Sequence, residues 1–308
     1  EAWIQAKAEQ AERLHWIGGE PLTHGFGSQA YRHWCEQREP ALPPPRCTLE
    51  HRWWLQRHPG VWERLDGQQT VVEQQRGPWP PGDGWLLLLA DDARLRREAL
   101  QALEEAIAQA AHCTPAQLLY PDEDRLDGSG RRHDPWFKPG WVPESFWSSP
   151  WLEACSAWSL RWLHDRRLPP PPTGDPTALW AWQLAAVAEQ PQVFAVPRVL
   201  VHRNAAAPAD PPQAERCAAL LQQQLRSQGE PVSVSPGATA GQFKLVWALP
   251  KQPPGVQVVI PSKDQAALLG RCLESLQRTC HAYPELLITV VDHASQEPAT
   301  AALLNTWR

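Results

Sequence analysis

The pattern of apolar and polar positions along this chain predicts an α/β fold. The continuous apolar run Trp85–Leu89 is typical of a buried strand, and the mainly apolar segment Val193–His202 predicts another. Apolar residues at helical spacing predict helices over 28–38 and 177–190, and a further helix that carries the apolar residues from Leu95 to Ile107 on one face. Because strands and helices alternate, we expect a sheet covered by helices.

Residues 256–308 predict a strand, a helix and a second strand. Val256–Pro261 and Leu286–Val291 are apolar and β-branched, and the apolar residues between Leu268 and Leu276 recur with a helical period. A strand–helix–strand connection makes the two strands parallel, so their carboxyl ends share one edge of the sheet. Ligands of open α/β sheets bind at that edge.

Three polar residues follow these two strands and are expected to converge on one crevice. They are Ser262 and Asp264 after the first strand and Asp292 at the end of the second. A carboxylate in such a place can accept hydrogen bonds from a nucleobase or a ribose. Capping and loop closure explain the same residues equally well.

The chain divides into four parts by composition. We expect a helical segment over 1–40, an α/β domain over 41–205, a linker of helix and strands over 206–255, and the start of a second domain over 256–308. Residues 46–84 show no clear element. The sequence contains no methionine, not even at its first position, so we expect a fragment of a longer product whose second domain is truncated.

Composition narrows the class of protein. The net charge is −5 and the basic residues are scattered, which argues against a nucleic-acid partner. No apolar run is long enough to span a membrane. Seven cysteines without CxxC spacing argue against a disulfide framework or a zinc ribbon. We expect a cytoplasmic location, with the inner face of the cell membrane as the alternative.

Eighteen tryptophans are an unusual number for a chain of 308 residues. Tryptophan rings stack on sugars, so carbohydrate contact is one interpretation. An aromatic core is the other, and it is favoured for most of these positions.

Two acidic groups in the first domain are candidate ligand sites. Asp91 and Asp92 follow the strand Trp85–Leu89 and could hold a divalent cation that in turn holds a diphosphate. Capping of the next helix is the better interpretation from spacing alone. The run Asp122–Asp124 could bind metal, but a solvated loop is at least as good an explanation. The sequence contains no GxSxG, HExxH, P-loop or Rossmann glycine fingerprint.

The segment IPSKDQAALLGRCLESL and the later YPELLITVVDHASQEPAT resemble the opening of a family 2 glycosyltransferase domain of the GT-A type. The resemblance implies a nucleotide-sugar donor whose base contacts Asp292. It also implies that the first loop borders the same pocket, through Pro261, Ser262 and Asp264. His293 and Ala294 depart from the usual pattern of Asn followed by Gly or Asn.

The earlier segments LLYPDEDRLDGSGRRHDPWFKPGW and VFAVPRVLVHRN resemble a narrower group, the large multi-domain bacterial glycosyltransferases of O-antigen and other surface polysaccharides. Ala90 and Ala93 replace two aspartates of that group's metal-binding strand end, and Asp92 alone keeps its place. The segment that carries the catalytic base in that group corresponds here to Trp180–Leu184, which contains no carboxylate. His202 matches a late histidine, which makes Asp92 and His202 the metal-ligand candidates.

These departures imply a degenerate GT-A-like, Rossmann-related domain that lacks most of its nucleotide-binding half. For the parent protein the resemblance implies inverting transfer of a sugar from a nucleotide sugar to a glycan or lipid-linked glycan acceptor, with Mn²⁺ or Mg²⁺. We expect this chain itself to be inactive, and no catalytic residue is assigned. The rival is a non-catalytic glycan-binding or scaffolding module that uses a tryptophan-rich surface.

Overall fold

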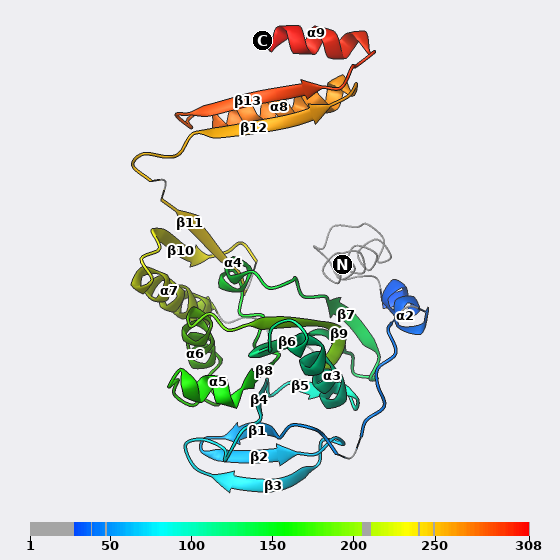
Figure 1. Cartoon of the computed structure of the whole chain (residues 1–308), viewed down its shortest axis with the longest axis vertical. Helices are drawn as coiled ribbons and strands as arrows, with labels where there is room; N and C mark the ends of the chain where they lie inside the picture. Colours follow the sequence, from blue (N-terminus) through cyan, green and yellow to red (C-terminus); the bar gives the residue numbers. More distant parts are fainter. Residues whose placement is uncertain are drawn as a thin grey trace. The chain divides into compact units, whose positions relative to one another are not determined.

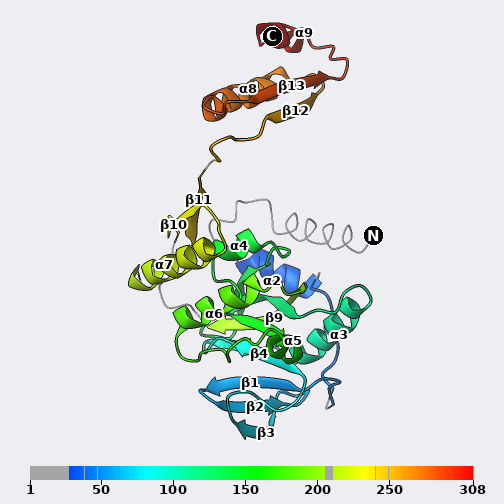
Figure 2. The same ribbon diagram turned by 60° about the vertical axis from the view of Figure 1, so that its left-hand side comes forward.

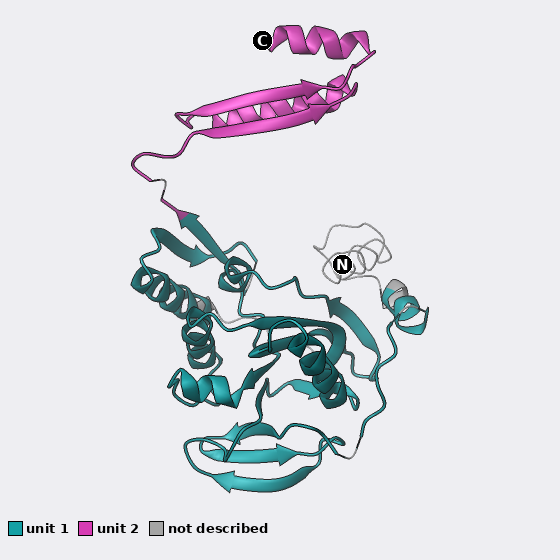
Figure 3. Ribbon diagram, in the orientation of Figure 1, with its two compact units in different colours: residues 1–246 teal, residues 247–308 magenta. Residues whose placement is uncertain are grey.

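The computed structural model describes residues 28–37, 39–46, 48–204, 211–239, 241–248 and 250–307. The chain forms two compact units, residues 1–246 and 247–308 (Figure 3). The helical pattern expected near the amino terminus, before residue 28, lies outside the described residues.

A large mixed sheet forms the centre of the first unit (Figure 1). Its strands are β1 (Trp53–His58), β2 (Val61–Leu65), β3 (Val71–Arg76), β4 (Trp85–Leu89), β5 (Ala93–Leu95), β6 (Leu118–Leu126), β7 (Arg132–Trp136), β8 (Cys155–Ser159) and β9 (Val193–Asn204). The order is β3-β2-β1-β4-β8-β6-β9-β5, and β7 pairs with β6. β1 with β4 and β6 with β9 are parallel, whereas the other pairs are antiparallel. This mixed α/β architecture is compatible with a Rossmann-related fold.

Helices cover both faces of this sheet. They are α2 (Ser28–Gln37), α3 (Ala99–Ala111), α4 (Pro143–Trp147), α5 (Leu160–Asp165), α6 (Pro176–Ala188) and α7 (Pro211–Ser227). Side chains of a strand alternate between faces. Leu86 and Leu88 of β4 therefore join the core under α5, α6 and α7, while Trp85 and Leu87 join the core under α3.

The structure confirms the strands predicted around Trp85 and Val193 and corrects three other expectations. Residues 53–76, which showed no clear element, form the antiparallel meander β1–β3, which lies at one end of the unit in both Figure 1 and Figure 2. Leu95 ends β5 instead of belonging to a helix, because α3 begins only at Ala99. The expected loop after Tyr120 continues β6 as far as Leu126.

Most of the expected linker packs on the first unit. Cys217, Leu221 and Leu225 of α7 are buried in the same core as α6. The two-stranded sheet β10 (Val232–Pro236) and β11 (Phe243–Trp247) follows α7, and the Phe243 ring stacks on Trp180 at 4.9 Å between centroids. The first compact unit therefore extends to residue 246.

The second unit has the strand–helix–strand order that the sequence predicts. It contains β12 (Val256–Ser262), α8 (Ala266–Cys280), β13 (Leu286–Asp292) and α9 (Pro298–Thr306). β12 and β13 pair in parallel from Val256 opposite Leu286 to Ser262 opposite Asp292. Leu269 and Leu273 of α8 are buried.

The tryptophans mainly build the core, as favoured above. Trp53, Trp54, Trp62, Trp158 and Trp180 are among the largest fully buried side chains. Among the described residues, Trp136 and Trp247 are the most exposed tryptophans, each at 41%. The surface rich in tryptophan that the rival hypothesis requires is thus not found in the described part of the chain. Within that same part, no helix combines the length and apolar character needed to cross a membrane.

Candidate functional site

A cavity of about 280 Å³ opens where β1 and β4 end. The two strands are parallel, so their carboxyl ends meet at one edge of the sheet. Arg57 lines the cavity from β1, and Asp91 and Asp92 line it from the turn after β4. Glu153 precedes β8, and residues 172–176 lead into α6; both complete the wall.

Asp92 is held by an arginine at this edge. β5 pairs with β9 so that Ala93 lies opposite Arg203, which brings Arg203 beside Asp92. The guanidinium donates three hydrogen bonds to the carboxylate, at 2.8, 3.0 and 3.2 Å. Burial favours the neutral guanidine, but the hydrogen bonds that Arg203 donates to Asp92 and the negative charge of Asp92 outweigh it and raise the pKa of Arg203. Asp92 does not cap α3, which begins at Ala99, so the capping interpretation was wrong.

Glu153, like Arg57 and Asp175, lines the cavity but was not predicted from the sequence as a site residue. Burial raises the pKa of its carboxyl group; the nearby Arg203 opposes this shift, and the Asp92 and Glu123 carboxylates add to it. The Glu153 carboxyl group lies 4.0 Å from the Arg203 guanidinium, too far for a hydrogen bond. Glu153 therefore gains a proton at a higher pH than an ordinary glutamate.

The other two carboxylates of the cavity differ in their roles. Asp175 caps α6, because its side chain accepts a hydrogen bond from the backbone N–H of Thr177 at 2.9 Å. Asp91 is exposed, and no hydrogen bond or ion pair to its carboxylate is found within the described residues. Asp91 is thus the carboxylate most available to a ligand.

His202, the second metal-ligand candidate, lies in a different environment. Successive residues of β9 point to opposite faces, so His202 and Arg203 diverge. The His202 ring contacts the buried carboxylate of Asp124, which also accepts hydrogen bonds from Tyr31 at 2.7 Å and Arg132 at 2.5 Å. The structure therefore does not bring Asp92 and His202 together. Both carboxylate oxygens of Asp92 are bonded to Arg203, and Nδ1 of His202 contacts Asp124, so the two residues do not fit a shared metal.

The acidic run Asp122–Asp124 is neither a solvated loop nor free to bind metal. All three residues are buried in β6. Asp122 accepts a hydrogen bond from the backbone N–H of Lys138 at 2.8 Å, and Glu123 pairs with the buried Lys138 ammonium at 2.7 Å. In the ranges that the structure describes, no group of three or more His, Cys, Asp or Glu side chains could hold a metal ion.

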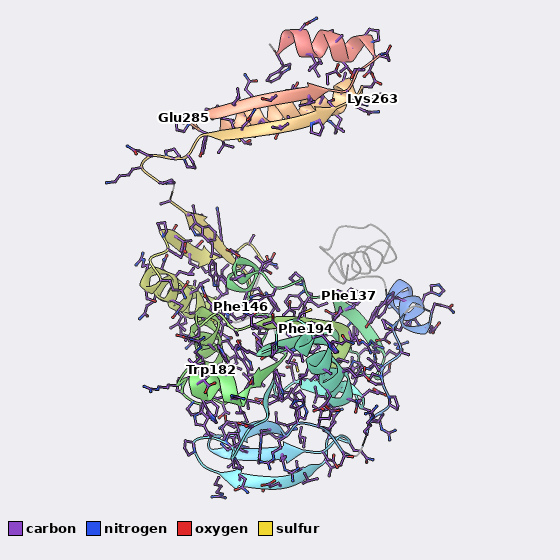
Figure 4. The ribbon with its side chains drawn as sticks, viewed as in Figure 1. Phe137, Phe146, Trp182, Phe194, Lys263 and Glu285 are labelled. Carbon is purple, nitrogen blue, oxygen red and sulfur yellow. The ribbon has the colours of Figure 1, made fainter. Side chains whose placement is uncertain are left out.

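The second unit brings its predicted residues together at the carboxyl edge. Ser262 lies opposite Asp292, and Pro261 lies opposite Val291. Lys263 marks this edge in Figure 4, and Glu285 marks the opposite end of the two strands. Ser262, Asp264 and Asp292 thus lie at the same edge, whereas the ligand crevice expected between them stays a prediction.

The hydrogen bonds of Asp264 and Asp292 hold together the loops that follow β12 and β13. Asp264 accepts hydrogen bonds from the backbone N–H groups of Gln296 and Glu297, at 2.7 and 2.8 Å, and these bonds lower the pKa of its carboxyl group. Ser295 donates from its hydroxyl to Asp292 at 2.5 Å. Asp264 also has a left-handed backbone, with φ of 55°. Residues with such φ are uncommon and cluster at functional sites.

The chain is 28% identical over 222 residues to the O-antigen biosynthesis protein RfbC of Myxococcus xanthus. The match covers 66% of this chain but only 16% of that protein. No protein-family model matches the chain.

Proposed function

We propose that this chain belongs to a glycosyltransferase of bacterial polysaccharide biosynthesis, which transfers a sugar from a nucleotide-sugar donor to a glycan or lipid-linked glycan acceptor. The similarity to an O-antigen biosynthesis protein carries this proposal. The mixed α/β sheet of the first unit and the parallel strands of the second are compatible with it.

The second unit is the nucleotide-contacting part in this proposal. Asp292 and Asp264 lie at the carboxyl edge of β12 and β13, where parallel sheets bind ligands. A carboxylate there accepts hydrogen bonds from the N–H groups of a base or the hydroxyls of a ribose. Ser262 and Pro261 border the same edge.

The first unit is non-catalytic in this proposal. Transfer of the inverting kind requires a base that removes the proton of the acceptor hydroxyl, and Trp180–Leu184 offers no carboxylate for it. A divalent cation would stabilise the leaving diphosphate of the whole enzyme. The Asp92–Arg203 pair does not fit such an ion, because the guanidinium already occupies both carboxylate oxygens. The cavity beside this pair, lined by Asp91, Glu153 and Thr173, favours the second candidate function, a glycan-binding role for the first unit.

Calorimetric titration of the full chain with UDP, with and without Mn²⁺, tests the assignment. We expect weak binding that does not require Mn²⁺ and is lost in Asp292→Ala. Glu285→Ala is the matched control, because it removes a carboxylate from the opposite end of the same two strands (Figure 4). Binding that requires Mn²⁺ and is lost in Asp92→Ala would instead make the first unit the donor site. No UDP binding in either condition would contradict the role given to Asp292.

A further inference from the structure

We propose that the cavity at the ends of β1 and β4 binds a single uncharged sugar ring of a glycan. It would do so as a non-catalytic subsite and would not take the diphosphate of a nucleotide sugar. This inference rests on the proposed role of the chain in polysaccharide biosynthesis, and it assigns the glycan-contacting site of the first unit.

The size of the cavity fits one ring. Its volume is about 280 Å³, close to the lower end of roughly 300–1,000 Å³ that small-molecule pockets span. A nucleotide sugar carries a base, a ribose, two phosphates and a sugar, and it needs a larger site. One pyranose ring of a longer glycan can enter while its neighbours stay in solvent.

The charge of the cavity disfavours a diphosphate. Asp91, Glu153 and Asp175 contribute carboxyl groups, and Arg57 is the cation on the wall. The Arg57 guanidinium lies 3.4 Å from the carboxylate of Glu63, which neutralises part of its charge. Arg203, the next cation, is engaged by Asp92. A phosphate group would therefore meet unpaired negative charge, and like charges repel at this range.

A neutral polyhydroxylated ring meets favourable partners at the same wall. Its hydroxyls can donate hydrogen bonds to the free carboxylate of Asp91 and to Glu153. Thr173 offers a hydroxyl that both donates and accepts. Leu88 and Leu179 provide the apolar surface on which the C–H face of a ring can lie.

The cavity is built on ordered elements. Asp175 fixes the start of α6, and the carbonyl of Pro169 accepts a hydrogen bond from the Trp182 indole at 2.7 Å, which ties the proline-rich loop to that helix. Arg203 fixes Asp92 on the other side. A preformed site loses less freedom when it binds, which favours a small ligand.

Ligand-observed saturation-transfer NMR on the full chain tests the proposal, with glucose, galactose and N-acetylglucosamine as probes. We expect saturation transfer to at least one of them. Thr173→Trp, which fills the cavity, should abolish it. Asp91→Ala should weaken binding about tenfold, the effect of losing one hydrogen bond to a charged group. Asp83→Ala is the matched control: Asp83 is an exposed carboxylate just before β4, whereas Asp91 lies just after it, and binding should not change.

The outcomes separate this inference from the proposed function. Absence of transfer to all three probes, or transfer that survives both Thr173→Trp and Asp91→Ala, overturns it. Displacement of the sugar by UDP also overturns it, because the cavity would then be a nucleotide site. UDP binding, and its loss in Asp292→Ala, is measured separately. The sugar site can therefore fail while the proposed function stands, and the proposed function can fail while the sugar site stands. Because Asp91 is exposed, Asp91→Ala remains informative if Thr173→Trp does not fold.

Discussion

Replacing Asp124 by asparagine removes the central charge of a buried network. The Asp124 side chain is fully buried and is bonded by Tyr31, Arg132 and His202. Removing one partner of a buried ion pair costs about 3–5 kcal/mol, because the opposite charge stays buried. Arg132 keeps two hydrogen bonds to Glu39, at 2.6 and 2.8 Å. We therefore expect a loss near the lower limit, about 3 kcal/mol of unfolding free energy.

Urea denaturation followed by tryptophan fluorescence measures this loss. Asp134→Asn is the matched control, since Asp134 follows closely in the chain but its side chain is 47% exposed, and its effect should be much smaller. The hydrogen bond from His202 and the charge of Arg132 outweigh burial and lower the pKa of Asp124. Because the folded-state pKa of Asp124 is lowered, its ionised carboxylate stabilises the fold at any pH above the ordinary aspartate pKa of about 3.9. This stabilisation is lost as the pH falls through the folded-state pKa. The difference between wild type and variant should shrink over that acidic range. A difference below about 1 kcal/mol at neutral pH would refute the reasoning and show that the network adds no net stability.

Two further predictions follow from burial. The pKa of Glu153 is raised, so ionisation of its carboxyl group destabilises the fold. Glu153→Gln should therefore have a higher unfolding free energy than wild type at neutral pH. Urea denaturation should show that this difference disappears below the ordinary glutamate pKa of about 4.3. An advantage independent of pH would contradict this. Leu221 of α7 is fully buried, so Leu221→Ala should lower the unfolding free energy by about 2–5 kcal/mol. The exposed Gln223→Ala should change it by less than about 0.5 kcal/mol; equal effects would show that α7 is a loosely attached linker.

The sequence predicts well those elements whose burial is visible as a local run or period of apolar residues. Trp85–Leu89 is apolar at every position because both faces of β4 are covered, and it was placed to the residue. β12 and β13 end one residue later than expected. β3 carries polar residues and is largely exposed, so its sequence VVEQQR shows no periodicity that would distinguish it from a loop.

The parts that were missed depend on partners distant in sequence. Residues 121–126 look like a loop because they contain proline and charge. They form a strand because Lys138, Arg132 and His202 compensate the buried carboxylates. The same limit applies to the cavity. Nothing near Glu153 marks it as a cavity residue, and only the pairing of β5 with β9 brings Arg203 to Asp92.

The Asp92–Arg203 pair is the feature that most constrains the chemistry of the first unit. The guanidinium neutralises the carboxylate charge and bonds to both of its oxygens, as a divalent cation would. Oδ1 accepts two of these bonds and Oδ2 accepts one, so a cation would compete with Arg203 for the carboxylate. A cation at Asp92 would have to displace three hydrogen bonds, and bonds to charged groups contribute about 1.5–3 kcal/mol each. Among the ion pairs of the described residues, Arg203 would then keep only the long contact to Glu153, at 4.0 Å, so the pairing of Arg203 with Asp92 opposes cation binding at this edge of β4.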